Sequence, residues 1–383
     1  MRVGIFTDSY RPYTSGVVRS IDTFRTELEP KDVLFYIFAP RYPGCAPEER
    51  VYRFISVPAP TNPGFRLAVP LSLRIGATLK RLKLDLIHAH SPFLMGGLGA
   101  RWAKHLGIPL VFTYHTLYEE YVHYFPLLNG PARSATRRRT IGFCNRSDLV
   151  IAPTRVIETH LKDSGVSTHV KVLPTGVKLS VFRGGDREGF RKRYGISARE
   201  PVLVYVGRLG KEKNIEFLLR ALRFVNERVP GVRLVLVGGG PQRAELMERA
   251  RENRVERQVV FTGPIPPDKV KDSYAAGDIF VMASLTETQG LVIGEAKAAG
   301  LPAVAVSAQG VSEMVNEGVD GFLTPLDAEV FASRICRLVE DPGLRQTFQS
   351  NALKKAEELD ASRVAENLLV LYRTLLAGTG KSF

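Results

Sequence analysis

Two carboxylates, Glu287 and Glu295, stand eight positions apart in an otherwise uncharged segment that contains one interior turn residue, Gly290. On one continuous helix, eight steps at 3.6 residues per turn would leave them about 80° apart around the axis. We instead expect Glu287 in a loop and a helix that starts near Gly290 and carries Glu295. The backbone N–H groups of Gln289, Gly290 and Leu291 would then lie beside Glu287, next to an anion-binding helix N-terminus.

This combination suits a sugar nucleotide, whose hydroxyls bind carboxylates and whose diphosphate binds N–H groups. The spacing alone is weak, because surface helices are rich in Glu. A second segment supports it: the strand-like run Leu203–Val206 precedes Arg208 and Lys213, and a helical pattern follows from Phe217. Such basic residues sit where open α/β sheets bind ligands. Either cation alone is typical of a solvated surface, but together with the Glu pair they indicate diphosphate binding.

Histidines offer a second candidate for chemistry. His115 closes a predicted strand, Leu110–His115, at the edge that we expect to face a ligand cleft, and both a structural and a catalytic role stay open for it. His88 and His90 lie two apart on a predicted strand and so share a face. They have no third ligand at metal spacing, and the chain has no D-x-D motif. We therefore predict no metal site and expect side-chain cations to hold the diphosphate.

The elements that must position these residues alternate as strand and helix, which predicts an α/β fold built on doubly wound parallel sheets. The first predicted strands are Arg2–Thr7, Val33–Ala39, Leu86–His90, Leu110–His115, Leu149–Pro153 and Val170–Pro174. The pattern restarts with Val202–Val206, Arg233–Val237, Val259–Thr262, Ile279–Ala283 and Ala303–Ser307. Helical patterns between strands include Val18–Leu28 and Leu71–Leu82.

The restart predicts two Rossmann-like domains, with the carboxyl edges of their sheets facing a cleft. We place the first domain at residues 1–176 and the second at 177–360, and expect the helical pattern 361–383 to pack back on the first. Gly184-Gly185 reads as a linker element. Gly16 follows the first strand and permits close backbone approach to a ligand. No G-x-G-x-x-G follows that strand, and Gly238-Gly239-Gly240 can equally be a tight turn.

The composition indicates two domains and a cellular compartment. The chain has 383 residues, 44% of them hydrophobic, enough for two cores. It holds no apolar run of eighteen residues, and Met1 to Arg11 lacks a signal-peptide core because Asp8 interrupts it. Its three cysteines, Cys45, Cys144 and Cys336, show no disulfide or metal spacing. We therefore expect a cytoplasmic protein.

The net charge is +14, and residues 1–150 carry the larger share, with 20 Lys/Arg against 11 Asp/Glu. Nucleic acid, anionic lipid or solubility could each explain this charge. An aromatic-apolar stretch lies beside a basic run, a pattern that suits an anionic bilayer surface. A packed loop next to a solvated helix is the alternative. The residues concerned are Tyr118, Tyr121, His123, Tyr124 and Phe125, followed by Arg137, Arg138 and Arg139.

In combination, these motifs resemble glycosyltransferase family 4 over nearly the whole chain. The resemblance is carried by Glu287–Glu295, Val206–Asn214, Tyr114–Thr116 and Leu173–Val177. The resemblance is greatest to the diacylglycerol glucosyltransferases, which build membrane glycolipids. The segments that carry this closer resemblance are Phe6–Tyr10, Thr113–Tyr121 and Thr286–Gly290. The resemblance implies the GT-B fold and a transfer that retains the configuration of the sugar.

The resemblance also implies roles for individual residues. Glu287 would contact the hydroxyls of the donor sugar and Glu295 the nucleotide ribose, while His115 would lie against the transferred sugar. The diphosphate would be bound by Arg208 and Lys213 with amides around Gly290 and Gly16, and the base by backbone groups from Gly263 to Ile265. UDP as the nucleotide is inherited from the family.

The function expected from sequence is a retaining glycosyltransferase that moves glucose from UDP-glucose to diacylglycerol. It would need no metal and would attach peripherally to the cytoplasmic face of the membrane. The acceptor is open: phosphatidylinositol or a soluble alcohol would keep the same donor chemistry. A non-catalytic nucleic-acid-binding protein is a remote alternative, because no recognisable nucleic-acid module or RNP-like motif is present.

Overall fold

The computed structural model describes all residues except 61, 73, 121–128 and 379–383. The chain forms two compact units, each built on its own sheet. Unit 1 comprises Met1–Gly176 and Ala361–Phe383, and unit 2 comprises Val177–Asp360.

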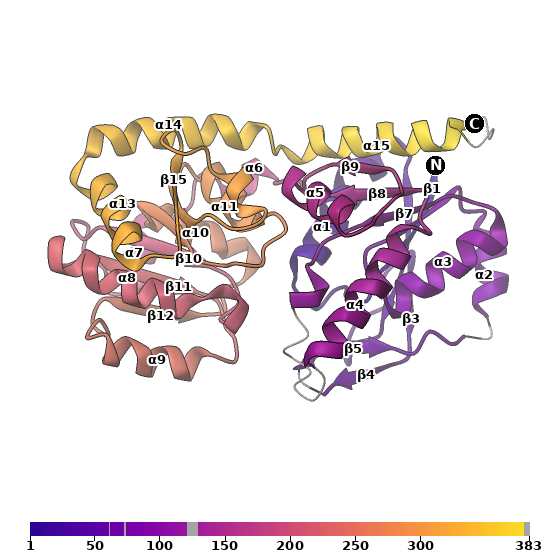
Figure 1. Ribbon diagram of the computed structural model, residues 1–383, viewed down its shortest axis with the longest axis horizontal. Coiled ribbons are helices and arrows are strands. Elements are labelled where there is room, and N and C mark those ends of the chain that lie inside the picture. The colour runs from indigo at the N-terminus through magenta and orange to yellow at the C-terminus, as the bar shows by residue number, and fades with distance from the viewer. Residues whose placement is uncertain (61, 73, 121–128, 379–383) are drawn as a thin grey trace. The chain divides into compact units, whose positions relative to one another are not determined.

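Unit 1 has a parallel sheet in the order β3-β2-β1-β6-β7-β8-β9 (Figure 1). Its strands are β1 (Arg2–Phe6), β2 (Leu34–Pro40), β3 (Val51–Phe54), β6 (Leu86–Ala89), β7 (Leu110–Thr113), β8 (Leu149–Ala152) and β9 (Val170–Val172). A separate antiparallel pair joins β4 (Ser56–Ala59) and β5 (Asn62–Ala68). The helices are α1 (Gly16–Leu28), α2 (Ile75–Leu82), α3 (Leu94–Leu106), α4 (Asn129–Cys144), α5 (Arg155–Asp163) and α15 (Ala361–Gly378).

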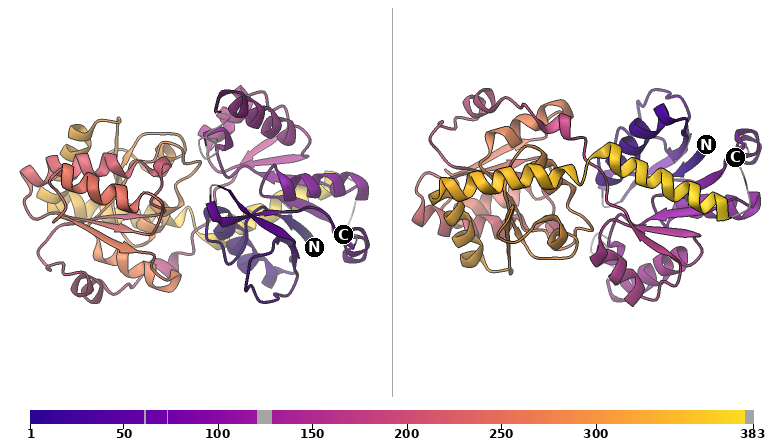
Figure 2. Two further views of the ribbon diagram at one scale, coloured as in Figure 1. Left: turned by 90° about the horizontal axis from the view of Figure 1, so that it is seen from below. Right: turned by 90° about the horizontal axis from the view of Figure 1, so that it is seen from above.

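Apolar side chains on both faces of the unit 1 sheet explain why helices cover it on both sides. One face packs against α1 and α15, where Phe24 and Leu368 are buried in the same cluster as Val111. The other packs against α3 and its neighbours, where Leu98 lies with Phe112. Figure 2 shows the last helix, α15, in yellow, and its contacts with α1 place it on unit 1.

Unit 2 has a parallel sheet in the order β12-β11-β10-β13-β14-β15. Its strands are β10 (Val202–Val206), β11 (Arg233–Val237), β12 (Val259–Gly263), β13 (Ile279–Met282), β14 (Ala303–Val306) and β15 (Gly321–Thr324). The longer helices are α7 (Arg187–Arg193), α8 (Ile215–Arg228), α9 (Arg243–Glu252), α10 (Val270–Ala276), α11 (Leu291–Ala298), α13 (Ala328–Glu340) and α14 (Pro342–Glu357). The short helices are α6 (Leu179–Phe182) and α12 (Val311–Met314), with the 3-10 turns η3 (Lys211–Lys213) after β10 and η4 (Pro267–Lys269) after β12.

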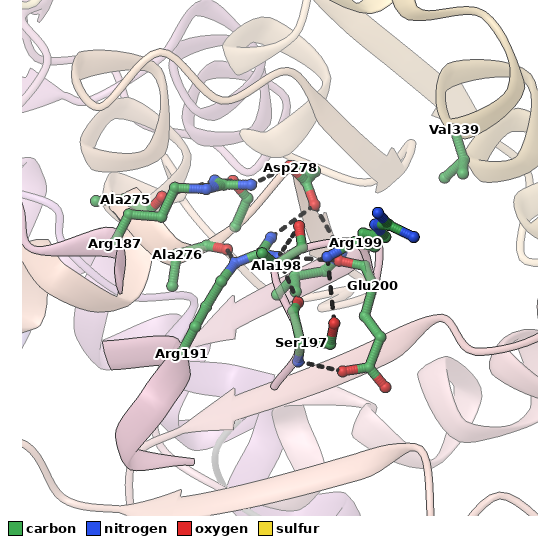
Figure 3. A network of polar contacts seen from close by, with 12 residues as sticks. Arg187, Arg191, Ser197, Ala198, Arg199, Glu200, Ala275, Ala276, Asp278 and Val339 are labelled. Atoms are coloured by element: carbon green, nitrogen blue, oxygen red, sulfur yellow. Dashed lines mark hydrogen bonds and ion pairs between the residues drawn. The ribbon is translucent and has the colours of Figure 1, made fainter. Parts of the chain in front are cut away.

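The buried guanidinium of Arg191 connects the segments that precede β10 and β13 at the amino edge of the unit 2 sheet (Figure 3). Arg191 is only 4% exposed; it forms an ion pair of 3.0 Å with Asp278 and donates to carbonyls of the turn at 197–200. Asp278 also pairs with Arg187 at 2.8 Å and accepts the amide of Val202 at 2.8 Å. The two guanidiniums share the Asp278 carboxylate and also bind backbone carbonyls, so we assign this network to the positioning of α7 beneath β10 and β13.

The doubly wound α/β fold class is confirmed, but several predicted boundaries are wrong. The strands expected to reach His90 and His115 end at Ala89 and Thr113, so both histidines lie in the loops that follow. The helix expected from residue 71 begins at Ile75. The strands β3, β4, β5 and β15 were not expected, because their short segments lack a clear apolar run.

The interpretation of Gly184-Gly185 as a linker is also wrong. Both glycines lie inside unit 2, between α6 and α7. A Cβ on Gly185 would come within 2.5 Å of the Lys271 carbonyl of α10, so this glycine allows close packing within the unit. The division between the units falls between Gly176 and Val177 and again between Asp360 and Ala361.

Candidate active site

The strand order of unit 2 reverses between β10 and β13, which lie side by side at the centre of the sheet. From β10 the chain proceeds outward to β11 and β12, and from β13 to β14 and β15. Open α/β sheets bind ligands at the carboxyl ends of the strands at such a reversal. Arg208 and Lys213 follow β10, and Glu287 to Gly290 follow β13. The fold therefore brings together the residues that sequence reasoning selected from two distant segments.

Lys213 and Glu287 form an ion pair across this reversal. Their side chains are 18% and 19% exposed, so each can still be reached by a ligand. Two further contacts tie the same loops together: the Asn214 amide group donates to the Ala283 carbonyl at 3.3 Å, and the Ser284 hydroxyl donates to the Glu212 carbonyl at 3.0 Å. The loop after β10 is thus fastened to the end of β13, with a cation and a carboxylate presented side by side.

Glycines position the loop that carries Arg208. A Cβ on Gly238 would lie 2.0 Å from the Gly207 carbonyl, and one on Gly240 would lie 2.3 Å from the Leu209 carbonyl. The Leu209 amide donates to the Gly239 carbonyl at 2.9 Å. The loops after β10 and β11 therefore pack backbone against backbone, which side chains would prevent. Sequence reasoning set these glycines aside as a possible tight turn and missed this role.

Helix α11 begins as expected, after Gly290, whose φ of +83° favours glycine. Gln289 is 4% exposed, and Glu295 is buried in the helix at the same fraction. The Tyr274 hydroxyl donates to Glu295 Oε2 at 2.7 Å. Leu291 is half-buried at the first position of the helix. Tyr274, which was not selected from sequence, therefore holds the Glu295 carboxylate in place.

The residues assigned to the base lie on the same edge of the sheet, two strands from β10. Gly263 ends β12 with a φ of +72°, and its carbonyl accepts the Gly238 amide at 3.1 Å. Ile265 follows in a half-buried position and packs on the apolar cluster beneath the sheet. Gly16 belongs to unit 1, where it opens α1 behind the N-cap Ser15.

His115 lies in unit 1, where β1 and β6 mark a second reversal of strand order. Its Nε2 is 2.8 Å from Nδ1 of His90, which follows β6. Burial lowers the pKa of His115 to about 3 and that of His90 well below its ordinary value, so both rings are neutral at physiological pH. His88 is likewise buried and neutral, with a pKa of about 3. Sequence reasoning noted these histidines but did not predict that they contact one another.

Asp8 is a further polar residue at this reversal that was not selected from sequence. Its carboxylate accepts the Ser91 hydroxyl at 2.6 Å and the Met95 amide at 2.8 Å, at the N-terminus of α3. Burial nevertheless raises its pKa above the ordinary value. The loop that bears His115 is held from its other side by Glu119, which accepts from the Tyr114 hydroxyl at 3.3 Å and lies 3.0 Å from His160 Nε2.

The proposed membrane-facing residues are only partly described. Tyr121, His123, Tyr124 and Phe125 lie outside the described residues. Tyr118 packs edge-on against Phe93 and Tyr114. This contact agrees with the alternative interpretation, in which the stretch is a packed loop. The three arginines lie on exposed positions of α4: Arg137 donates to the Ser164 hydroxyl at 3.1 Å, Arg138 is exposed, and the Arg139 guanidinium lies 5.9 Å from the Phe93 ring.

A groove of about 700 Å³ lies beside α3 of unit 1. Its apolar lining includes Phe93, Leu94, Ile108 and Leu110. Its charged lining consists of the cations Arg101, Lys104, Arg139 and Arg146 and one acidic residue, Asp148. Within the described part of the chain, none of these four cations forms an ion pair. An apolar channel edged by cations suits an anionic amphiphile.

Two features are absent from the described part of the chain: a metal-binding group of side chains and a membrane-spanning helix. Among the described residues, no three His, Cys, Asp or Glu side chains are grouped so that they could hold a metal ion. No helix in the described ranges is long and apolar enough to cross a membrane.

The groups at this edge of unit 2 are of the kinds that bind a phosphorylated sugar in proteins. They comprise two cations, a helix N-terminus and a carboxylate that can accept from hydroxyls. In general, cations can stabilise negative charge on a phosphate, and a carboxylate can accept hydrogen bonds from sugar hydroxyls.

Comparison with known proteins agrees with this chemistry. Residues 14–181 match the model for Glycosyltransferase Family 4, and residues 186–355 match that for Glycosyl transferases group 1. The chain is 33% identical to an alpha-monoglucosyldiacylglycerol synthase of Streptococcus pneumoniae, over 92% of this chain and 82% of that protein. It is 31% identical to a D-inositol 3-phosphate glycosyltransferase of Acidothermus cellulolyticus, over 87% of this chain and 78% of that protein.

A solved structure supports the same fold. The Anabaena protein HepE, determined in complex with UDP-glucose, superposes with a TM-score of 0.78 at 23% identity, covering 98% of this chain and all of that one. Three findings point to the same family: the two Rossmann-like units on parallel sheets, the two matching family models, and the relatives that align over most of the chain. The chain belongs to glycosyltransferase family 4 and is a nucleotide-sugar-dependent glycosyltransferase of the GT-B fold class.

Proposed function

We propose that the protein moves glucose from UDP-glucose to a hydroxyl of a membrane lipid such as 1,2-diacylglycerol, with retention of configuration, and forms an alpha-glycolipid. The observation that carries the donor half is the Lys213–Glu287 pair at the strand reversal of unit 2, with Arg208 in the same loop as Lys213. This arrangement combines a carboxylate that can accept from sugar hydroxyls with cations that can bind a diphosphate. The complex of the structural relative with UDP-glucose and the name of the pneumococcal relative support the choice of substrates.

In this reaction the bond from the anomeric carbon to the diphosphate oxygen breaks, and a bond to the acceptor oxygen forms on the same face. Negative charge builds on the departing diphosphate, where Arg208, Lys213 and the first amides of α11 stabilise it. The acceptor proton passes to the departing phosphate oxygen, so no protein nucleophile is required. Glu287 grips the sugar hydroxyls, Glu295 the ribose and backbone groups from Gly263 to Ile265 the base.

His115 of unit 1 lies against the transferred sugar in this proposal. Its neutral state matters, since a positive charge there would oppose the positive charge that develops on the sugar ring. The reaction needs no divalent ion in its chemical step. Turnover that persists with a chelator supports this expectation, whereas turnover that returns only with added magnesium or manganese contradicts it.

The groove beside α3 supports the membrane half of the proposal. Each cation near an anionic surface contributes about 1 kcal/mol of attraction. We expect the protein to sediment with vesicles that contain phosphatidylglycerol and to bind neutral phosphatidylcholine vesicles more weakly. The double variant Arg101→Gln with Arg139→Gln should lose about 2 kcal/mol of vesicle affinity, because two such cations are removed. Arg199→Gln, an exposed arginine of unit 2, is the matched control; equal affinity of both variants contradicts a membrane role for the groove.

A second acceptor class is favoured by one observation. The relative from Acidothermus cellulolyticus is named for D-inositol 3-phosphate, at an identity close to that of the pneumococcal relative. The groove cations would suit a phosphorylated polyol as well as a lipid head group. A soluble acceptor would leave turnover independent of vesicles.

One experiment tests donor and acceptor together. UDP-glucose, UDP-galactose, UDP-N-acetylglucosamine and GDP-mannose are each offered with diacylglycerol, phosphatidylinositol and inositol 3-phosphate, and the products are identified by mass spectrometry. The proposal predicts a glucosylated diacylglycerol whose anomeric proton coupling by NMR is that of an alpha linkage. A beta linkage contradicts retention, and transfer to inositol phosphate alone contradicts the lipid acceptor.

A further inference from the structure

Three imidazoles form a buried line in unit 1. His88 in β6 and His90 just after it point to the same side of the sheet. β7 runs parallel to β6 with Val111 opposite His88, which brings His115, two residues beyond β7, to that side as well. The ring centroids are 4.2 Å apart for His88 and His90 and 5.1 Å apart for His90 and His115.

The contact between His90 and His115 is directional. With both rings neutral, one nitrogen of the 2.8 Å pair must donate and the other must accept. This contact couples the tautomers of the two rings, because the one that donates determines that the other accepts, and it holds both ring planes, because rotation of either ring breaks the bond. His90 is 2% exposed, and water has little access from its side to replace the contact.

His90 is itself firmly held. Its backbone amide donates to the Phe6 carbonyl of β1 at 2.8 Å. Its ring lies against His88, whose Nδ1 is 2.6 Å from the Tyr372 hydroxyl and whose Nε2 is 2.7 Å from the Thr113 hydroxyl. Tyr372 belongs to α15, so the last helix of the chain supports the back of this line.

From these contacts we propose that His90 is a positioning residue, which sets the ring orientation and tautomer of His115. This inference rests on the proposed role of His115 beside the transferred sugar. His88, Thr113 and Tyr372 hold His90 in place, and His90 alone among them touches His115 through a ring nitrogen. Since Nε2 of His115 is engaged by His90, His115 acts as a fixed neutral dipole and does not exchange a proton with substrate through that nitrogen.

Asparagine and glutamine separate positioning from simple packing. The amide of asparagine occupies the place of histidine Nδ1, and that of glutamine the place of Nε2. Only His90→Asn can therefore keep a hydrogen bond to His115 Nε2, while His90→Gln and His90→Leu fill space without it. We expect kcat to fall about ten- to hundred-fold in His90→Leu and His90→Gln, since small misplacements of reacting groups have effects of this size. The KM for donor should change little, and His90→Asn should keep most of kcat.

A double-mutant cycle provides the second measurement. In a His115→Ala background, His90→Leu should cause little further loss of kcat, because its partner is already gone. Trp102, the single tryptophan, lies in α3 of unit 1, so its fluorescence reports whether each variant is folded. If His90→Leu does not fold, the comparison of His90→Asn with His90→Gln decides alone.

The outcomes separate this inference from the proposed function. Equal kcat in His90→Asn and His90→Gln, unchanged kcat in His90→Leu, or equal losses in both backgrounds would overturn positioning. Wild-type kcat in His115→Ala would instead overturn the role of His115, whatever the His90 variants do.

Discussion

The sheets of the two units share the same strand order over six strands, and unit 1 adds β9 at one edge, but the units place different side chains at the point where strand order reverses. In unit 1, neutral histidines are buried there and bonded to one another and to hydroxyls. In unit 2, the same position holds a lysine and a carboxylate that stay partly exposed. The shared topology offers a binding edge, and the side chains that follow the strands decide what that edge can bind.

This difference has an energetic meaning. Partly exposed charges can exchange a protein partner for a ligand at modest cost, which suits a site that must bind a diphosphate and release it. The buried histidines of unit 1 hold one another in a fixed orientation and carry no charge. A neutral side chain suits contact with a sugar ring on which positive charge develops. We expect unit 1 to respond to pH through its stability and unit 2 to respond to mutation through catalysis and nucleotide binding.

The largest effect should come from acid. The histidines His88, His90 and His115 have pKa values lowered by burial, so the unfolded chain takes up protons below pH 6.5 that the folded chain does not. Their contribution is fully present above pH 6.5 and is lost as pH falls toward about 3. The free energy of unfolding should fall by up to about 4 kcal/mol per pH unit, offset in part by Asp8, whose raised pKa acts in the opposite sense.

Urea unfolding of unit 1, followed by Trp102 fluorescence between pH 5 and 8, measures this. His90→Asn should lower the slope by about one proton, because it removes one of the three buried imidazoles. A stability of unit 1 that is constant across this range would contradict the description of the line as buried and neutral.

The next effect concerns the charges of unit 2. Replacing Lys213 with Ala should raise the activation free energy by about 3 kcal/mol, because a preorganised contact to the departing diphosphate is lost. The value of kcat should therefore fall roughly a hundred- to thousand-fold. Binding of UDP should weaken as well, while binding of uridine, which has no phosphate, should not. Lys211→Ala is the matched control, since Lys211 lies exposed in the same 3-10 turn. Equal losses of UDP and uridine binding would show that Lys213 only supports the loop.

A smaller effect is expected at Glu295. Tyr274→Phe removes a hydrogen bond to this carboxylate and should destabilise unit 2 by about 2 kcal/mol. The KM for the donor should rise, because the ribose contact loses its support. Tyr194→Phe, at the end of α7, is the control. An unchanged KM with lowered stability would leave Tyr274 a purely structural residue.

The smallest effect concerns the last helix. Tyr372→Phe leaves Nδ1 of His88 without the hydroxyl at 2.6 Å and should lower the stability of unit 1 by about 1 to 2 kcal/mol. Trp102 fluorescence in urea measures this, with Tyr36→Phe in β2 as the control. If Tyr372→Phe is as stable as the wild type, α15 holds unit 1 through its apolar face alone.

The sequence was sufficient for the fold class because the strands of a buried parallel sheet are short continuous apolar runs, as at Val202–Val206. It also predicted the start of α11 after Gly290, since a glycine with positive φ is a local signal. The short edge strands had no such signal. The ends of β6 and β7 were placed too late because His90 and His115 continue the apolar runs without a turn residue.

The contacts within the candidate site were less predictable. Lys213 and Glu287 are 74 positions apart, and only the adjacency of β10 and β13 brings them together. Tyr274 and Tyr372 were not selected, because a buried tyrosine in a helix reads as core and its hydrogen-bond partner is set by tertiary packing. The role of Gly238 depends on the path of a neighbouring loop, which no local pattern specifies.

The central claim is that the carboxyl edge between β10 and β13 binds the donor diphosphate. A crystal structure of the protein with UDP-glucose tests it most directly. We predict diphosphate oxygens within hydrogen-bond distance of Arg208 and Lys213, with the glucose hydroxyls on Glu287. A nucleotide sugar bound at full occupancy away from these residues would contradict the account.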